Sequence, residues 1–265
     1  MCDILIKNDH IINDLNLDTP IYKFVPLRYV LSMFINRNLY YGKTSTWEDS
    51  YENFFLKQHF RMNDGTSVDA TTLIPGIFGM CWTVLPESDA LWRIYSNYGL
   101  LNELQGDNPE LLLRYTAVRI KTTARKLFDA TYRSDADCSH VYIGKVEYLS
   151  GNDIDKRLQT NQPISPLNLN FAWVQSMFIK RIEFEHEHEV RSILTYTPED
   201  ERSHNDSLVF NIEPHEFIEE LTLDPRLTIG DEKFTINKLE EVGANPDIIN
   251  KSQLYSFNRQ IIQLQ

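Results

Sequence analysis

Short strand-like runs alternate irregularly with short helix-like segments, and this pattern limits the possible fold more than any single motif does. Strands are predicted at residues 20–25, 39–42, 77–84, 118–120, 141–148, 187–194, 207–212 and 221–223. Helices are predicted at residues 26–38, 89–98, 122–133, 163–180, 214–220 and 235–243, and Ser88 is the expected N-cap of the second. Because no regular strand–helix–strand repeat connects these elements, the pattern favours an α+β fold with short helices.

The composition and the lack of a flexible linker predict one globular domain. No linker rich in Gly, Ser or Pro divides the chain, so we expect an N-terminal extension over residues 1–19 and one domain over residues 20–265. No apolar run approaches the ~20 residues of a membrane helix, and the N-terminus lacks the features of a signal peptide. Cys2, Cys81 and Cys138 are too few and too widely spaced for a disulfide framework. We therefore expect a cytoplasmic protein with no membrane partner.

Charge is distributed unevenly along the chain. Residues 181–250 contain 18 acidic and six basic residues, which accounts for the net charge of −12, and the rest of the chain is balanced. In contrast, residues 114–133 carry six basic residues and one acid, Asp129. This basic stretch fits a solvated helix face with an Arg125–Asp129 pair. The alternative is a small patch that binds an anion or a nucleic acid.

The most distinctive local pattern is the acidic run from Glu183 to Arg191. On a strand, Glu187, Glu189 and Arg191 project from the same face. Two carboxylates this close repel each other unless water or a cation compensates them, and Arg191 is placed to be that cation. The pattern therefore predicts either a catalytic carboxylate with Arg191 as structural support, or an exposed acidic strand end.

Metal binding is not expected at this run. His186 and His188 alternate with the glutamates and lie on the opposite face of the predicted strand. A zinc site needs two further ligands, and the sequence points to none. We therefore predict no metal site.

A second candidate site combines basic and hydroxyl groups around the first predicted helix. Tyr22 and Lys23 lie near a strand end, and Thr44, Ser45 and Thr46 form a hydroxyl-rich loop after the next strand. Such donors can hold phosphates. The chain has no Gly-rich GK[ST] run and no GxGxxG fingerprint, so an ordinary strand–helix–strand unit is the alternative.

The third pattern is aromatic. Cys81-Trp82-Thr83 ends a predicted strand, and Trp92 and Tyr95 share a face of the following helix. Aromatic residues at helical spacing form core more often than binding sites, so a core role is favoured here. Cys81 has no neighbouring base to activate it, and we interpret it as a small buried hydrophobe.

Together these motifs resemble a large bacterial family that is described only as a domain of unknown function. The resemblance covers roughly residues 20–255 and follows the order Tyr-Lys-Phe, Leu-Tyr-Tyr, Cys-Trp-Thr, Leu-Trp-Arg-Ile-Tyr, then Lys180 before Glu187-x-Glu189-x-Arg191. It departs at Glu48-Asp49-Ser50-Tyr51-Glu52, where the family usually has Asn-Asp-Pro-Phe-Glu, and at the longer stretch 99–114. More distantly, the layout is similar to the ADP-ribosyltransferases, including nucleic-acid-modifying toxins of toxin–antitoxin and phage-defence systems.

The distant resemblance implies a split, mixed or antiparallel sheet and a site that uses NAD as substrate without a metal. Lys23 matches the basic position on the first strand, Thr44 and Ser45 lie near the second position, and Glu189 with Glu187 matches the glutamate position. Aromatic residues able to stack on nicotinamide or adenine are Tyr22, Trp92 and Tyr95. We therefore predict that Tyr22, Lys23 and residues 44–46 line one cavity with Glu187 and Glu189.

The function implied by this resemblance is NAD-dependent ADP-ribosyl transfer by a toxin or defence effector. The acceptor is a nucleic acid (RNA or DNA) or a protein, and an antitoxin that docks on the acidic stretch 181–250 is an expected partner. Two alternatives remain open from the sequence. One is a non-catalytic interaction or sensor module, and the other is a metal-dependent nuclease that uses Asp49, Glu52, Glu187 and Glu189.

Overall fold

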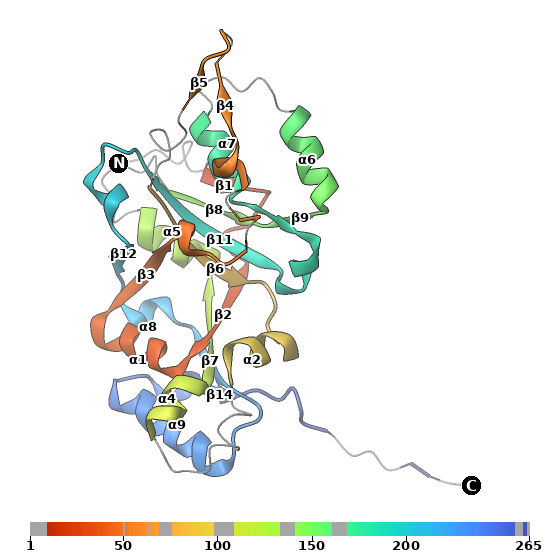
Figure 1. Cartoon of the computed structure of the whole chain (residues 1–265). Coiled ribbons are helices and arrows are strands. Elements are labelled where there is room, and N and C mark those ends of the chain that lie inside the picture. Colours follow the sequence, from red (N-terminus) through yellow and green to blue (C-terminus); the bar gives the residue numbers. More distant parts are fainter. Residues whose placement is uncertain are drawn as a thin grey trace. The chain divides into compact units, whose positions relative to one another are not determined.

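A computed structural model (Figure 1) describes residues 10–49, 51–52, 54–62, 64–68, 76–97, 109–132, 141–160, 169–257 and 262–263. The chain forms two compact units. Unit 1 comprises Met1–Ile21, Asn38–Leu85 and Thr123–Ile212, and unit 2 comprises Tyr22–Arg37, Pro86–Thr122 and Glu213–Gln265. Helices and strands are mixed in both units, so the predicted α+β class with a mixed sheet is confirmed. Among the described residues, no helix is both long enough and apolar enough to cross a bilayer.

The sheet of unit 1 has two long central strands. Its order is β1 (Ile11–Ile12), β8 (Val141–Lys145), β11 (Glu189–Tyr196), β6 (Gly76–Thr83), β3 (Asn38–Lys43) and β12 (Ser207–Asn211). β1 and β8 pair in parallel, and all the other neighbours are antiparallel. β6 and β11 are buried along nearly their whole length; β6 is mostly apolar on both faces, whereas β11 carries the buried polar residues Glu189, Arg191 and Ser192.

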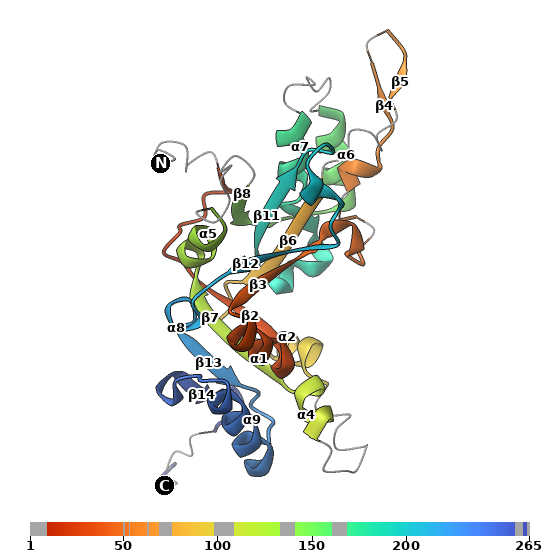
Figure 2. The same ribbon diagram turned by 90° about the vertical axis from the view of Figure 1, so that its left-hand side faces the viewer.

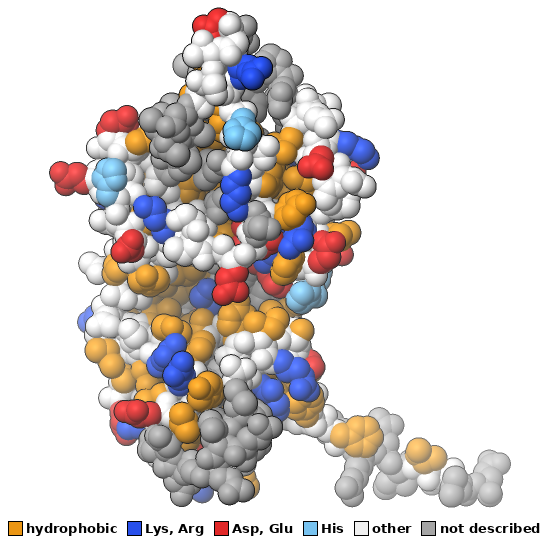
Figure 3. All heavy atoms as spheres, in the orientation of Figure 1, with side chains coloured by type: hydrophobic (Ala, Val, Ile, Leu, Met, Phe, Trp, Pro, Cys, Tyr) orange, Lys and Arg blue, Asp and Glu red, His pale blue; other side chains and the backbone are white. Residues whose placement is uncertain are grey.

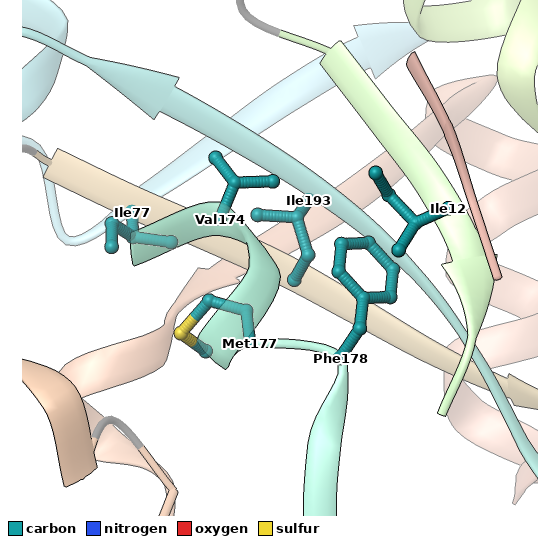
Figure 4. Packing of buried hydrophobic residues seen from close by; sticks show 6 residues of the cluster. All are labelled: Ile12, Ile77, Val174, Met177, Phe178 and Ile193. Carbon is teal, nitrogen blue, oxygen red and sulfur yellow. The ribbon is translucent and has the colours of Figure 1, made fainter. Parts of the chain in front are cut away.

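Helices and short strands complete unit 1. The helices are α5 (Ala124–Tyr132), α6 (Gly151–Thr160) and α7 (Leu169–Ser176), with 3-10 turns η2 (Thr44–Thr46), η3 (Phe54–Lys57), η7 (Ile182–Glu187) and η8 (Glu201–His204). β9 (Glu147–Leu149) pairs with β10 (Ile179–Arg181), and β4 (Phe60–Arg61) pairs with β5 (Ser67–Val68). Figure 4 shows how the core joins α7 to the sheet through Ile12, Ile77, Val174, Met177, Phe178 and Ile193.

Unit 2 is built on the strands β2 (Pro20–Pro26), β7 (Ala117–Thr123), β13 (Glu220–Leu223) and β14 (Ile249–Lys251), in that order. Its helices are α1 (Leu27–Asn36), α2 (Asp89–Tyr95), α4 (Pro109–Tyr115), α8 (Pro214–Phe217) and α9 (Ile229–Glu241), followed by η9 (Pro246–Ile248). α9 lies beside β14 in both views (Figures 1 and 2). Ser88 caps α2 as predicted, since its hydroxyl accepts from the backbone N of Leu91.

Several predicted boundaries are wrong for identifiable reasons. The strand expected at 187–194 begins at Glu189, because His188 adopts a left-handed backbone with φ of 43°. The strand expected at 141–148 is broken at Val146, where the chain leaves the main sheet to form β9. Within the predicted helix 163–180, residues 163–168 lie outside the described residues, and α7 gives way to β10 at Ile179.

Other differences concern capping and charge pairing. α9 begins six residues earlier than predicted, because the Thr228 hydroxyl accepts from the backbone N of Asp231 and caps it. The basic stretch 114–133 does not form one helix face, since Arg119 and Lys121 lie on β7 and Arg125 lies on α5. Arg125 Nε donates to Asp18 at 2.8 Å, so its main partner is not Asp129. The single-domain boundary at residues 19 and 20 stays a prediction.

Candidate active site

A backbone bend at His188, between η7 and β11, separates two glutamates. Glu187 ends η7, and Glu189 begins β11. Thr83 Oγ donates to the carbonyl of Glu187 at 2.7 Å, and the backbone N of Glu189 donates to Tyr148 Oη at 2.8 Å. These bonds tie the bend to β6 and β9, so the two carboxyl groups start from a rigid base.

Both carboxyl groups converge on one lysine. Lys180 Nζ donates to Glu187 Oε2 at 2.7 Å and to Glu189 Oε1 at 2.9 Å, and it lies 3.7 Å from Glu52 Oε1. Arg191 Nε donates to Glu189 Oε2 at 2.6 Å, and Arg191 Nη2 pairs with Glu52. We call these five residues the Lys180 cluster. Strand, turn and loop residues up to 139 positions apart thus form one ionic network.

Burial makes this network electrostatically strong. The Arg191 side chain is 0% exposed and the other members are nearly as buried, except Glu187, whose side chain is 21% exposed. Arg191 Nη1 also donates to the carbonyl of Met177 at 2.7 Å. Charges in such a site interact far more strongly than in water, and each needs a partner. Glu187 is therefore the member of the cluster with most access to solvent.

The two glutamates have opposite pKa shifts. Burial alone raises the pKa of Glu189, but the Arg191 guanidinium, the hydrogen bond from Glu187 and Lys180 outweigh it and hold that pKa well below its usual range. Burial raises the pKa of Glu187 to about 7, and its hydrogen bond with Glu189 adds to this effect while Lys180 opposes it. With a pKa of about 7, Glu187 is partly protonated near neutral pH. Glu189 is the permanent anion, and Glu187 is the group that exchanges the proton.

An aromatic residue from the loop after β3 covers the cluster. The Arg191 guanidinium lies 4.7 Å from the centre of the Trp47 ring. Trp47 also lies directly on Gly79 of β6, where an added Cβ would come within 2.6 Å of the indole. Glycine at position 79 therefore leaves the space that the indole occupies beside Arg191.

The predicted hydroxyl loop lies elsewhere along the same sheet. Thr44 is buried and its hydroxyl donates to the carbonyl of Ile77 at 3.2 Å, whereas Ser45 is exposed. Lys43 is paired with Phe78, and Glu189 is paired with Thr83, five residues further along β6. This register separates the two positions by roughly 17 Å. From this part of the chain, Glu52 belongs to the cluster and Trp47 contacts it. NAD binding by Thr44 and Ser45 stays a prediction.

The remaining predicted NAD-binding residues lie in unit 2. The Tyr22 ring lies 5.1 Å from the Arg119 guanidinium, Lys23 is half-buried, and Tyr95 is exposed. Trp92 has no exposed surface, packs edge-on against Phe24 at 4.8 Å between ring centres, and donates Nε1 to Glu87 at 2.5 Å. A ring without exposed area cannot stack on a ligand unless its neighbours move, so the structure favours the core interpretation of Trp92. The shared cavity with Glu187 and Glu189 stays a prediction.

Unit 2 contains a buried arginine that sequence reasoning treated only as part of a basic stretch. Arg119 Nη2 donates to Glu220 Oε1 at 2.5 Å and to Thr222 Oγ1 at 2.7 Å, and Nη1 lies 3.5 Å from Glu87 Oε2. Ser252 Oγ donates to Glu87 at 2.7 Å. We call Glu87, Arg119 and Glu220 the Arg119 cluster. Its carboxylates have neutral donors as well as the arginine.

Sequence reasoning found only part of the Lys180 cluster. Glu189, Glu187 and Arg191 were predicted together, whereas Lys180 was named only in the resemblance pattern, and Glu52 only in that pattern and as a nuclease candidate. The carboxylates that the nuclease hypothesis needs are paired with cations, since Asp49 accepts from Arg181 Nη2 at 2.9 Å and the others belong to the cluster. Over the described ranges, no group of three or more His, Cys, Asp or Glu residues is arranged to hold a metal.

Comparisons with known proteins give only distant likenesses. No protein-family model matches the chain, and no curated protein matches it. Among solved structures, Thermus sp. 2.9 DarT in complex with NAD+ is similar with a TM-score of 0.36 and 13% identity, covering 91% of this chain and 99% of that chain. DarT in complex with ADP-ribosylated ssDNA is similar with a TM-score of 0.36 and 12% identity, covering 91% and 97%. At such scores the likeness carries no functional weight, and the chain's own residues must support any proposed chemistry.

Proposed function

We propose that this chain transfers ADP-ribose from NAD to an acceptor, with Glu189 and Glu187 as its catalytic residues. The observation that carries the proposal is that one buried network shifts the pKa values of two nearby carboxyl groups in opposite directions. Glu189 stays ionised because Lys180 and Arg191 bind it, and Glu187 titrates at about 7. A fixed anion beside a proton-exchanging group is the pair that glycosyl transfer requires.

Glu189 would act on the bond that breaks. Cleavage of the bond between nicotinamide and the ribose C1′ leaves both bonding electrons on the nicotinamide, which departs neutral, and positive charge develops on the ribose. A buried carboxylate stabilises that charge strongly because the site needs no reorganisation. Glu189 Oε1 accepts a hydrogen bond from Lys180 and Oε2 accepts one from Arg191, and the hydrogen bond from Glu187 adds to them, so the network holds the carboxylate in place.

Glu187 would act on the bond that forms. The acceptor atom donates its lone pair to C1′ and must lose a proton, which the ionised Glu187 carboxylate takes and passes to water. Its 21% exposed side chain gives that proton a route to solvent. Since the pKa of Glu187 is about 7, transfer should increase as the pH rises through neutrality.

The biological setting belongs to the same proposal. A toxin or defence effector of this kind would be restrained by an antitoxin, and its acceptor would be a nucleic acid or a protein. Composition supports an antitoxin that docks on the acidic stretch 181–250. Several of those acids are already engaged, however, since Glu213, Glu219 and Glu232 form ion pairs with Arg37, Lys121 and Lys251. The charge available for docking is therefore smaller than the composition indicates.

The proposal is tested by incubating the protein with labelled NAD, without divalent metal, in the presence of RNA, DNA or cell lysate. We expect nicotinamide release and label on one class of acceptor. Nucleic-acid cleavage that a chelator abolishes, without nicotinamide release, would instead identify the nuclease alternative. Binding of a partner with neither reaction would identify the interaction module.

A further inference from the structure

We propose that the outer edge of β12 pairs with the same strand of a second copy of this chain, so that two sheets join into one across a two-fold axis. The partner is thus another molecule of the same protein, bound through backbone hydrogen bonds. No residue of β12 belongs to the Lys180 cluster, so the proposal is independent of the proposed function.

β12 forms one border of the sheet of unit 1. It pairs with β3 on one side, and over the described ranges no strand pairs with its other side. It lies at the left margin of unit 1 in Figure 1 and faces the viewer in Figure 2. An open edge presents unpaired backbone N–H and C=O groups, which are a template for a further strand.

The register of β12 on β3 identifies these backbone groups. The backbone N of Lys43 donates to the carbonyl of Asp206, the residue before β12, at 3.2 Å. Because hydrogen bonds in an antiparallel pair fall at every second residue, Leu208 and Phe210 bond to β3 in the same way. The groups that point away from β3 belong to the alternate residues Ser207, Val209 and Asn211.

The two borders of this sheet differ in their protection against such pairing. β1, at the opposite border, has only two residues, and Asn13 and Asp14 after it both have positive φ, which ends the strand. β12 has five residues, contains no charged residue and no proline, and keeps an unbroken register with β3. Edge strands that stay single are usually short, charged, bulged or interrupted by proline. β12 has none of these features, which indicates an edge that accepts a further strand.

The sequence of β12 is complementary to itself. In an antiparallel pair centred on Val209, each Val209 lies opposite its counterpart, and each Ser207 lies opposite Asn211 of the other copy. Each of these opposed pairs exchanges two backbone hydrogen bonds, so every outward N–H and C=O group of the strand is satisfied. On the other face of the strand, Leu208 lies opposite Phe210. Polar residues thus meet polar residues and apolar residues meet apolar ones on both faces.

Exposed apolar side chains lie beside this edge. Val209 is 54% exposed, and it is paired across the ladder with Tyr40 of β3, which is 60% exposed. In the proposed dimer the two valines lie side by side at the axis, with one tyrosine beyond each of them. Pairing therefore removes apolar surface from water as well as satisfying the backbone.

Net charge opposes this association only at long range. β12 brings no charged side chain against another, but each copy carries a net charge of −12. On the face drawn in Figure 3, acidic and basic side chains are interspersed. Salt shortens the range of repulsion from about 30 Å at 0.01 M to about 8 Å at 0.15 M. The dimer should therefore become stronger as salt is added.

Sedimentation velocity of the full chain from about 1 μM to about 1 mM tests the proposal. A pair of five-residue strands is small beside the ~1,200 Å² of a standard interface, so we expect a weak dimer that dissociates on dilution. Val209→Lys should weaken it by about 100-fold or more, because two like charges then lie opposite each other at the axis. Ile35→Lys is the matched control, since Ile35 is 67% exposed on α1 and the change in charge is the same. Melting curves check that both variants fold.

Hydrogen exchange of the wild-type protein tests the strand pairing itself. Raising the protein concentration should slow exchange at the amides of Ser207, Val209 and Asn211, whereas Leu208 and Phe210 should be protected at every concentration. A dimer that forms without slowing the three outward amides would overturn the proposal, as would equal weakening by Val209→Lys and Ile35→Lys. An affinity that falls with added salt would also overturn it. A chain that stays monomeric throughout would overturn it and leave the edge to a strand of another protein.

Discussion

Arg191 in unit 1 and Arg119 in unit 2 are both buried arginines that bind carboxylates, but the two clusters satisfy those carboxylates differently. In the Arg119 cluster, Glu87 accepts from Trp92 and Ser252, and Glu220 accepts from Thr222. In the Lys180 cluster, the side-chain partners of the glutamates among the described residues are Lys180, Arg191 and one another.

Exposure reinforces this difference. The carboxylates of the Arg119 cluster are about 30% exposed, so water also solvates them. Burial raises the pKa of Glu220, but hydrogen bonds from Thr222 and Arg119 outweigh it and the pKa is lowered overall. Among the described residues no neutral side chain provides Glu187 with such a set of hydrogen bonds, and its pKa is raised. The difference shows when a buried carboxyl group keeps a raised pKa and can exchange a proton near neutral pH. This happens when neutral donors and water do not stabilise its charged form.

The largest expected effect comes from removing the central cation of the Lys180 cluster. Arg191→Ala leaves Glu52 and Glu189 buried with Lys180 alone, and breaking a buried ion pair in this way costs about 3–5 kcal/mol. Urea unfolding of the variant and the wild type measures this loss. A variant as stable as the wild type would show that the cluster contributes nothing to folding.

The matching change in the other cluster should cost less. Arg119→Ala should lower the free energy of unfolding by about 1.5–3 kcal/mol, the scale of losing hydrogen bonds to charged groups, because neutral donors and water still satisfy Glu87 and Glu220. The same urea titration provides the measurement. A loss of stability equal to that of Arg191→Ala would contradict the proposed difference between the two clusters.

The smallest expected effect is a loss of stability as the pH rises toward neutrality, which we expect from Glu187 and not from Glu220, whose pKa is lowered. The pKa of Glu187 is raised from 4.5 to about 7, so its contribution to stability is fully present below pH 4.5 and is lost as the pH rises through 7. Glu187→Gln should remove this loss from a plot of Tm against pH, and should also remove the rise in transfer near pH 7. Glu185→Gln is the control, since Glu185 is exposed on the same turn. An unchanged pH profile in Glu187→Gln would contradict the assigned proton.

The fold was predictable where burial follows a simple period. β6 is long, mostly apolar and central, so its sequence predicts a strand directly. The bend at His188 was not predictable, because its positive φ is held by Thr83 and Tyr148, which contact the adjacent backbone from distant segments. Hydrogen bonds of this kind override local preference.

The site was predictable only where its members are close in sequence. Glu189 and Arg191 lie two residues apart and were predicted as a pair, which the structure forms at 2.6 Å. Glu52 reaches Arg191 across 139 residues, and no local pattern indicates that contact. Arg125 shows the same limit, because the partner at helical spacing was Asp129 and the structure supplies Asp18 from 107 residues away.

Nicotinamide release from NAD by Glu189→Gln, compared with Glu220→Gln, tests the central claim most directly. Both changes replace a carboxylate that is bound to a buried arginine by a neutral amide of the same size. The account predicts that Glu189→Gln lowers the rate by about 100-fold or more, the scale of losing one electrostatic contact to the transition state. It predicts that Glu220→Gln stays close to the wild-type rate. A folded Glu189→Gln protein that releases nicotinamide as fast as the wild type would contradict the account.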